Sequence, residues 1–340
     1  MTPKTAQDQA ASVLTGKRVL VTGGAGFVGS HIVDQLVDAG CAEVLVIDNM
    51  IRGRRENLGR AIQSNRVKLF VDDIRNTALL SELVEGSDIV FHQAALRITH
   101  CAAEPRAAME VMVGATFDLL EMCAKSRVRK VVMASSASVY GMAEEFPTTE
   151  RQHSYANRTL YGAAKSFGEG LLRSFNDMYG MDYVALRYFN VYGPHMDIHG
   201  RYTEVLIRWI DRLAAGERPV IFGDGKQTMD MLHVKDVARA NILAAEASAS
   251  DVVLNVGSGT ETSLLELAHV LARIMGRPDL TPIFEKERAV NPVPRRLSDT
   301  TAARELIGFE TGIPLEAGLR ELVAWWREQK VMAAVQEAAQ

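Results

Sequence analysis

Short apolar runs alternate with longer amphipathic stretches through the first half of the chain. Runs of strand length occur at 17–22, 43–48, 66–71, 88–92, 129–134 and 183–187. Between them, apolar residues recur at helical spacing at about 29–40, 76–85, 105–126 and 160–179. Strands that alternate with helices are typical of a parallel sheet with helices on both faces. The pattern therefore predicts an α/β fold built on a doubly wound parallel sheet.

The second half of the chain is less regular and is interrupted by Gly- and Pro-rich turns. Helical spacing recurs near 202–215, 235–247, 263–275 and 315–328. We expect a flexible tail at 1–15, a first domain at 16–190, a smaller mixed α/β lobe at 191–330 and a C-terminal tail at 331–340. The chain can cross back from the second lobe to the first.

Composition excludes several classes of protein. The chain has 340 residues, 47% hydrophobic and 24% charged, and a net charge of −4. No basic field attracts nucleic acid or an anionic membrane, and no apolar run reaches transmembrane length. Residues 1–15 lack an apolar signal core, so we expect a cytoplasmic protein. The three cysteines show no metal spacing, and we assign no metal site.

A glycine-rich segment follows the first predicted strand. Residues 24–29 read Gly-Ala-Gly-Phe-Val-Gly and open the next predicted helix. Glycines there allow the backbone and the helix N-terminus to approach a pyrophosphate, which is the dinucleotide-binding fingerprint. Asp48 ends the next strand, where a carboxylate accepts hydrogen bonds from a ribose diol and repels a 2′-phosphate. This favours NAD, although Arg52, Arg54 and Arg55 keep NADP open.

Two further strand ends carry polar or small residues. Asp72 and Asp73 follow the third strand, where a carboxylate could accept from an adenine amino group or serve as a strand-end cap. His92 ends the fourth strand, and the small residues Ala94 and Ala95 leave room for a flat ligand. We interpret His92 as a packed or hydrogen-bonded residue and not as a catalyst.

A tyrosine and a lysine stand four residues apart after the fifth strand. Ser136 ends that strand, and Tyr161 and Lys165 share one face of the following helix. Positive charge from Lys165 and from NAD⁺ is expected to lower the phenol pKa toward neutrality, which makes the phenolate a general base. Alone, Tyr-x-x-x-Lys is often an ordinary exposed pair. After a dinucleotide fingerprint, it indicates redox chemistry on a carbinol.

These residues resemble the extended short-chain dehydrogenase/reductase family, and in particular its nucleotide-sugar epimerases and dehydratases. The resemblance covers roughly residues 17–328. It rests on motifs in family order, which are Thr22–Gly29, Ser136 with Tyr161 and Lys165, Arg187–Pro194, Gly223–Asp230, and Arg296 with Asp299. It implies a Rossmann-type NAD-binding domain at 16–190 and a substrate-binding lobe at 191–330.

The resemblance also implies the contacts of individual residues. Ser136, Tyr161 and Lys165 would be catalytic. The cofactor would be bound by Gly23, Gly26, Phe27, Val28, Gly29, Asp48, Asn49, Asp73, Ile74, Ala94, Ala95, Tyr161, Lys165 and Tyr188. A nucleotide-diphosphate sugar would contact Arg97, Ser136, Ser138, Asn190, Gln227, Arg296 and Asp299.

The residues after Ser136 narrow the reaction. Dehydratases of the family carry Asp-Glu there, and the UDP-glucuronate decarboxylases carry Glu at the second position. This chain has Ala137 and Ser138. The resemblance therefore favours an NAD-dependent 4-epimerase acting on a UDP-hexose or UDP-uronic acid. A dehydratase, decarboxylase or reductase of the same family is the alternative, and a non-catalytic NAD-binding sensor is a second.

The chain departs from the family pattern at two places. Met229 stands where many members have an arginine that pairs with the diphosphate, which leaves the nucleotide open. Val111 and Ala115 replace an Asn and a Thr, which suggests local repacking. The helices at 105–126 and 160–179 correspond to a four-helix bundle across a dimer axis in the family, so we expect a homodimer.

Overall fold

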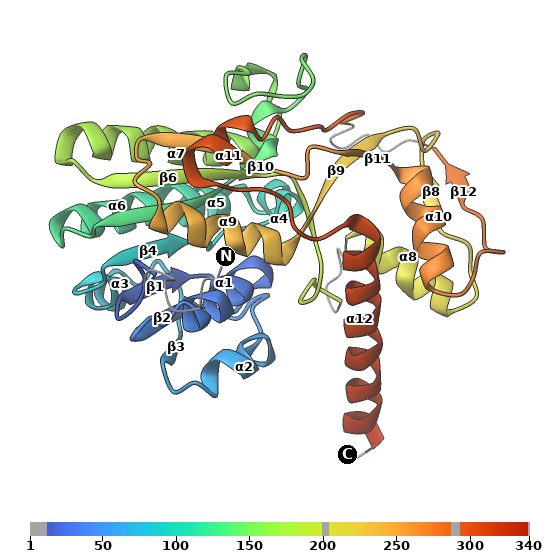
Figure 1. Ribbon diagram of the computed structural model, residues 1–340, viewed down its shortest axis with the longest axis horizontal. Helices are drawn as coiled ribbons and strands as arrows, with labels where there is room; N and C mark the ends of the chain where they lie inside the picture. Colours follow the sequence, from blue (N-terminus) through green and yellow to red (C-terminus); the bar gives the residue numbers. More distant parts are fainter. Residues whose placement is uncertain (1–11, 199–203, 287–292, 339–340) are drawn as a thin grey trace, which may run out of the picture.

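The computed structural model describes residues 12–198, 204–286 and 293–338, and a parallel sheet forms its centre (Figure 1). The strand order is β10-β6-β5-β4-β1-β2-β3, and all neighbouring strands are parallel. The strands are β1 Arg18–Thr22, β2 Glu43–Asp48, β3 Val67–Val71, β4 Ile89–His92, β5 Lys130–Ser136, β6 Asp182–Tyr188 and β10 Val252–Val256. The predicted α/β fold is confirmed, and β10 is a strand that the sequence did not reveal.

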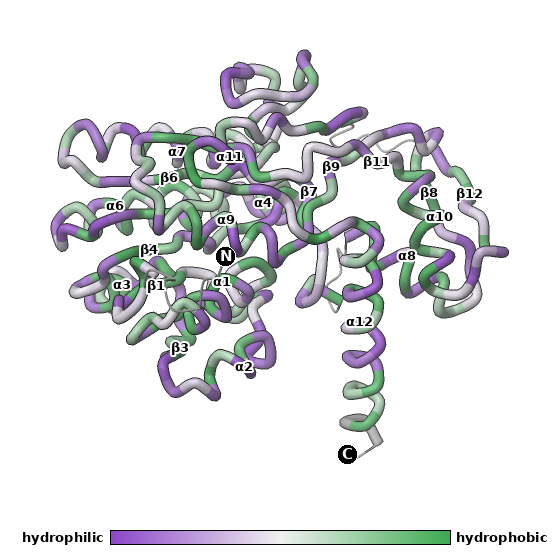
Figure 2. The backbone as a smooth tube through the Cα atoms, viewed as in Figure 1, coloured by the Kyte–Doolittle hydropathy of each residue, from purple (hydrophilic) through white to green (hydrophobic). Residues whose placement is uncertain are grey.

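Helices cover both faces of this sheet because each has one apolar face. One core cluster lies under α1 (Phe27–Asp38), α2 (Gly59–Ile62), α9 (Val234–Glu246) and α11 (Thr301–Ile307). The opposite cluster lies under α3 (Thr77–Val84), α6 (Ala115–Lys125) and α7 (Leu160–Tyr179). Hydrophobic residues occur on the strands and on the helices that cover them (Figure 2). Burial of apolar surface on both sides stabilises the doubly wound arrangement.

The predicted helix at 105–126 is interrupted at its centre. It is built from α5 (Pro105–Met109), a π-helical turn at Glu110–Gly114, and α6. Val111 lies in this turn and is buried. Single π turns inside helices are commonly found near functional sites. The short helix α4 (Ile98–Ala103) precedes this region.

A smaller lobe packs around its own core, with Trp209 and Tyr192 among its fully buried side chains. One small sheet has the order β11-β9-β7, and the other pairs β12 with β8. These strands are β7 Asn190–Tyr192, β8 Val220–Phe222, β9 Thr228–His233, β11 Glu261–Ser263 and β12 Ile283–Glu285. The lobe's helices are α8 Val205–Ala214, α10 Leu264–Ile274 and α12 Leu315–Ala338.

Parts of both segments expected as tails belong to the described fold. Of the expected N-terminal tail, residues 1–11 lie outside the described residues, but Leu14 is fully buried in the large core. At the other end, α12 was expected at 315–328 and continues to Ala338, through most of the segment expected as a tail (Figure 1). Helix α9 and strand β10 come after residue 190 in the sequence but belong to the large domain. β10 is a strand of the large sheet, and α9 packs on one face of that sheet.

Candidate functional site

The sequence-predicted site residues converge on the carboxyl ends of the central strands. Thr22 of β1 pairs with His92 of β4, and Ser136 of β5 pairs with Tyr188 of β6, so these strands end together. The strand order reverses direction between β1 and β4. In open α/β sheets, ligands bind in the crevice at such a switch point.

The glycine loop can accept only glycine at two positions. Gly23 has a positive φ of 67°, and a Cβ there would lie 2.8 Å from the backbone nitrogen of Ala94. A Cβ on Gly29 would lie 2.7 Å from the Cα of Gly24 and would also meet the Gly23 carbonyl. Helix α1 starts directly after Gly26, whose N-cap position has no side chain to cover the free N–H groups. This cradle fits the pyrophosphate of a dinucleotide.

Asp48 holds the glycine loop as well as facing the crevice. Its carboxylate accepts hydrogen bonds from the backbone N–H groups of Ala25 (3.0 Å) and Met50 (2.9 Å). Burial raises the pKa of this carboxyl, while the backbone N–H groups lower it. Gly53 packs so closely on the carboxylate that a Cβ would lie 2.5 Å from Oδ1. The role of Asp48 toward a ribose stays a prediction.

The third strand end presents a network of polar side chains. Asp73 accepts hydrogen bonds from Asn49 (2.9 Å) and from Arg75, whose Nε lies 2.9 Å away. The Arg75 guanidinium lowers the pKa of Asp73 to about 2. Ile74 is buried below this network. An adenine would meet an ionised carboxylate already held by Asn49 and Arg75.

His92 belongs to a buried hydrogen-bond chain, which confirms that it is a packed strand-end residue. Its Nδ1 lies 2.8 Å from Thr22 Oγ1, and its Nε2 lies 3.0 Å from Thr116 Oγ1. Burial lowers the pKa of His92 to about 3, so the ring is neutral. The Thr22 hydroxyl also accepts from the N–H of Ala94. This chain of hydrogen bonds therefore fixes the backbone at Ala94, next to Ala95, where we expect the flat ligand to lie.

The three expected catalytic side chains lie together. The Tyr161 phenol is hydrogen-bonded to Ser136, and the Lys165 Nζ lies 5.9 Å from the Tyr161 ring centroid. Lys165 also donates to the carbonyl of Ala134 at 2.6 Å. The Ser136 Oγ accepts from the N–H of Ser138 at 3.1 Å. The short helix at Ala137–Tyr140 therefore places Ser138 beside the hydroxyl of Ser136.

Burial acts against the lowered Tyr161 pKa that is expected from Lys165 and NAD⁺ together. Burial raises the pKa of the Tyr161 phenol, and the hydrogen bond from Ser136 and the charge of Arg296 offset part of that effect. Burial also lowers the pKa of Lys165 to about 8. Desolvation therefore outweighs the local cations, and a phenolate requires further positive charge.

Tyr188 lies below the crevice with its hydroxyl already occupied. The hydroxyl is 2.9 Å from Asn241 Oδ1 and 3.1 Å from Gln93 Oε1. Burial raises the pKa of this phenol. Any contact of Tyr188 with the cofactor would therefore use the ring and not the hydroxyl.

Two expected substrate residues carry buried amides with unused hydrogen-bonding capacity. Among the described residues, neither Asn190 Oδ1 nor Gln227 Oε1 has a hydrogen-bond partner. Buried polar atoms without partners are rare in native proteins and require an explanation. Asn190 is the first residue of β7, and Gln227 immediately precedes β9, the strand that pairs with β7. A polar ligand between the lobes would satisfy these atoms.

The late segment places one arginine near Tyr161, the expected general base. Arg296 interacts electrostatically with Tyr161, and burial lowers the pKa of Arg296 to about 10. Arg295 is instead bound by Glu261 through two contacts of 2.7 Å. The Asp299 carboxylate accepts from the N–H of Thr301 at the start of α11. Arg296 is therefore the better placed of the two arginines for a ligand in the crevice.

Met229, which replaces the usual arginine, packs against the apolar core of the small lobe. A guanidinium directed the same way would be desolvated without a charged partner. The replacement is therefore consistent with the packing of this lobe.

An ionic cluster that the sequence analysis missed surrounds Arg97. The Arg97 Nη1 lies 3.6 Å from Glu204 and 3.9 Å from Asp197, and the Nε of Arg52 lies 3.7 Å from Asp197. Arg52 and Arg97 follow strands β2 and β4, whereas both acids belong to the second half of the chain. The pairing of charges from two lobes has no signal in local spacing.

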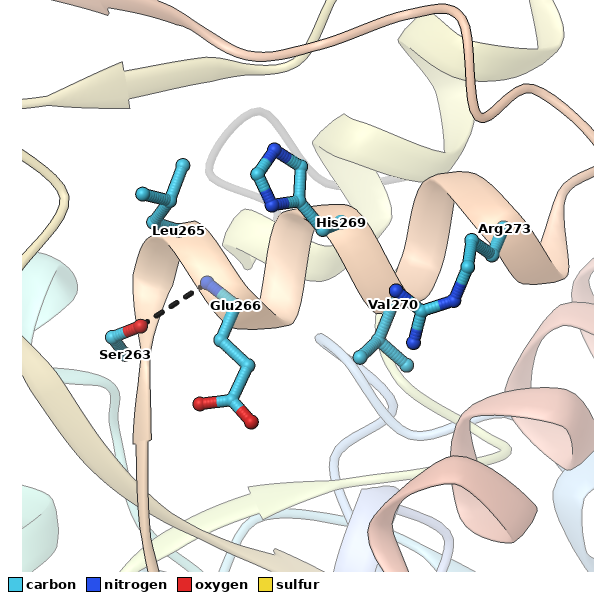
Figure 3. Close-up of a pocket in the computed structure, with 6 residues that line it drawn as sticks. All are labelled: Ser263, Leu265, Glu266, His269, Val270 and Arg273. Atoms are coloured by element: carbon cyan, nitrogen blue, oxygen red, sulfur yellow. Dashed lines mark hydrogen bonds between the residues drawn. The ribbon is translucent and has the colours of Figure 1, made fainter.

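The described residues also contain a separate cavity of about 370 Å³ on the surface of α10 (Figure 3). It is lined by Ser263, Leu265, Glu266, His269, Val270 and Arg273. None of these is a sequence-predicted site residue, so we assign the function to the crevice. Within 12–198, 204–286 and 293–338, no His, Cys, Asp or Glu cluster suits a metal, and no helix has the length and apolarity to span a bilayer.

Comparisons with known proteins agree with this geometry. Residues 19–257 match the NAD dependent epimerase/dehydratase family. UDP-glucose 4-epimerase of Mycolicibacterium smegmatis is 36% identical over 315 residues, which span 92% of this chain and 99% of that protein. UDP-N-acetyl-alpha-D-glucosaminuronate decarboxylase of Bacillus cytotoxicus is 30% identical over 322 residues, 92% of this chain and 98% of that protein.

A solved structure is similar over nearly its whole length. It is the UDP-N-acetylglucosamine 4-epimerase of Methanobrevibacter ruminantium in complex with UDP-N-acetylmuramic acid. The TM-score is 0.87 and the identity 35%, with 93% of this chain and 99% of that chain covered. The glycine cradle, the assembled Ser136, Tyr161 and Lys165, and these matches lead to one conclusion. This chain belongs to the NAD-dependent epimerase/dehydratase family and uses NAD as its cofactor.

Proposed function

We propose that the protein is a nucleotide-sugar 4-epimerase whose substrate is a UDP-hexose or a UDP-uronic acid. The observation that carries this proposal is the composition of the active site after Ser136. Ala137 is buried, and Ser138 donates its N–H to the Ser136 hydroxyl. Neither side chain can act as the acid or base that water elimination requires. Oxidation and reduction at one carbon needs only the groups that the site retains.

The roles of the three residues follow from their geometry. Tyr161 takes the proton of the sugar 4-hydroxyl and later returns it. The Ser136 hydroxyl, already hydrogen-bonded to Tyr161, stabilises the oxygen that loses this proton. Lys165 holds positive charge beside the phenol. Bound NAD⁺ would accept the hydride from C4 and return it to the opposite face of the 4-keto sugar, and its cationic nicotinamide ring would supply the further charge that favours the phenolate.

The carboxylate of Glu204 is the acidic group to consider for the rival dehydratase and decarboxylase reactions. Glu204 interacts electrostatically with Tyr161. Its carboxylate is already ion-paired with Arg97 at 3.6 Å. A dehydratase or decarboxylase would need Glu204 to take the role of the missing acidic residues.

The decisive experiment is to incubate the purified protein with UDP-, GDP-, CDP- and dTDP-sugars, including uronic acids, and to resolve C4 epimers. We expect epimerisation of a UDP-sugar without net consumption of NAD. A 4-keto-6-deoxy or decarboxylated product would replace the proposal with a rival reaction. No product from any sugar, with NAD still bound, would favour the non-catalytic sensor.

The role of Tyr161 is tested by Tyr161→Phe. Loss of the general base is expected to lower kcat by about 10² to 10⁴ while bound NAD is retained. Tyr179→Phe on the same helix is the matched control, because Tyr179 is exposed and remote from the crevice. Turnover that survives Tyr161→Phe unchanged would refute the mechanism.

We also propose that the protein is a homodimer through the outer faces of α5, α6 and α7. These helices expose Met109, Phe117, Phe167 and Met178. Each is 44% or more exposed, and Phe167 and Met178 lie about three turns apart on one side of α7. We expect Phe117→Asp with Phe167→Asp to halve the mass measured by light scattering. A wild-type monomer at micromolar concentration would remove the proposal.

A further inference from the structure

Helix α7 carries a third polar residue on the face that holds Tyr161 and Lys165. Glu169 stands one helical turn after Lys165 and is buried. Side chains four residues apart on a helix are neighbours. A buried carboxylate is costly unless it is paired and hydrogen-bonded, so the partners of Glu169 indicate what it does.

Glu169 binds the two strands on which the catalytic helix rests. Its Oε2 accepts from Arg187 Nη2 at 2.6 Å, and its Oε1 accepts from Arg187 Nε at 2.8 Å and from Ser135 Oγ at 2.5 Å. Ser135 and Arg187 are paired residues of β5 and β6. Ser135 also precedes the catalytic Ser136. The ion pair therefore fixes the rotation of α7 against the strand that ends at Ser136.

Arg187 extends the same contact to the segment after Ser136. Its Nη1 donates to Tyr140 Oη at 2.9 Å and to the carbonyl of Glu150 at 3.1 Å. The Tyr140 hydroxyl donates to Asn255 Oδ1 at 2.6 Å. Tyr140 ends the short helix that contains Ser138. Three segments that carry site residues thus meet at one buried ion pair.

The charge of Glu169 also acts on Lys165. The titratable groups that face Lys165 are Cys101 of α4, His92 of β4, and Tyr161 and Glu169 of α7. His92 is neutral, and burial lowers the pKa of Lys165 to about 8, against the opposite effects of Cys101 and, to a smaller extent, of Glu169. Glu169 therefore opposes the effect of burial on the ammonium group.

We propose that Glu169, held by Arg187, is a positioning residue of the active site: it fixes the Tyr161 and Lys165 face of α7 against Ser136 and places a negative charge one helical turn from Lys165. This inference rests on the proposed function, because it assumes that Tyr161 and Lys165 are catalytic. It assigns a mechanistic role to a buried pair outside the catalytic trio.

The test compares Glu169→Gln with Ser135→Ala in the full-length protein with bound NAD. Glu169→Gln removes the charge and keeps the shape, so Lys165 should lose its proton at lower pH. The alkaline limb of the kcat–pH profile should move down by about one pH unit, the size expected for one nearby charge in a protein interior. Ser135→Ala removes a hydrogen bond to the same carboxylate and should leave the limb in place.

A second readout does not depend on turnover. The pH at which Lys165 loses its proton, followed by NMR of its ¹³Cε signal in protein labelled at lysine, should fall in Glu169→Gln and stay unchanged in Ser135→Ala. If this shift appears but no sugar is epimerised, the proposed function fails and the role of Glu169 stands. If neither the Lys165 titration nor the limb moves, the proposal is overturned.

Glu169→Gln leaves the Arg187 cation buried without its partner, which can prevent folding. In that case the double variant Glu169→Gln/Arg187→Met carries the test, because no charge is left unpaired. It lacks the carboxylate but also the opposing Arg187 cation, so a downward shift smaller than in Glu169→Gln is expected. A purely structural role would instead lower kcat equally at every pH.

Discussion

Gly162 links the packing of α7 to catalysis, and replacing it with alanine should misplace the adjacent Tyr161. An alanine Cβ would lie 2.6 Å from the carbonyl oxygen of Ser138 and would also meet the side chain of Asn157. An unstrained carbon–oxygen contact is about 3.3 Å, so the methyl group must move by about 0.7 Å. The Ser138 carbonyl belongs to the backbone two residues after the end of β5 and cannot rotate away as a side chain could. We therefore expect α7 to move.

This displacement would break a hydrogen bond that the mechanism needs. Tyr161 is hydrogen-bonded to Ser136, and an O–H···O bond of ordinary length lengthened by about 0.7 Å lies beyond hydrogen-bonding range. Misplacement of a reacting group by about 1 Å costs roughly 100-fold in rate, so we expect Gly162→Ala to lower kcat by about ten- to 100-fold. The cofactor contacts of the glycine loop are distant from Gly162, so the NAD content should not change.

The assay is the initial rate of C4 epimer formation at saturating substrate, with NAD content and urea unfolding measured on the same preparation. Gly170→Ala is the matched control because a Cβ at Gly170, on the same helix, would meet nothing within 4 Å. It should stabilise the protein by about 1 kcal/mol and leave kcat unchanged. Its mass in solution should also be checked, because Gly170 lies on the proposed dimer face. If Gly162→Ala keeps kcat within about twofold of wild type, the packing argument is wrong.

Two other substitutions test the supports of the site. Asp230 is fully buried and accepts hydrogen bonds from residues 258–259 and from Ser298, so Asp230→Ala should lower the free energy of unfolding by about 4 kcal/mol and raise KM. Equal urea midpoints for the wild type and for Asp230→Ala would contradict the expected loss of stability. Gly29→Ala would place a Cβ inside contact distance of the glycine-loop backbone, so the purified protein should lack NAD. Gly59→Ala, where a Cβ meets nothing, should keep it; NAD retained at wild-type content in Gly29→Ala would refute the close-contact argument.

The local order of apolar and polar residues was sufficient to predict most of the large domain. Six of the seven strands of the large sheet and helix α7 lie where the pattern placed them, because strand and helix periodicity is written in neighbouring residues. β10 was missed although its residues form a short apolar run, and its place in the large sheet is decided by its pairing with β6. Leu14 was assigned to a tail for the same reason, since its burial depends on distant residues.

The sequence by itself determined the chemistry available to this protein. The glycine loop, Ser136, and the Tyr161 and Lys165 pair are local motifs, and each requires only a strand end or one helical turn to present its groups. The tertiary structure decided how those groups behave. Desolvation raises the pKa of Tyr161 against the expected direction, and Glu169 meets Arg187 across two elements. Both effects depend on every atom around a side chain, which spacing along the chain does not encode.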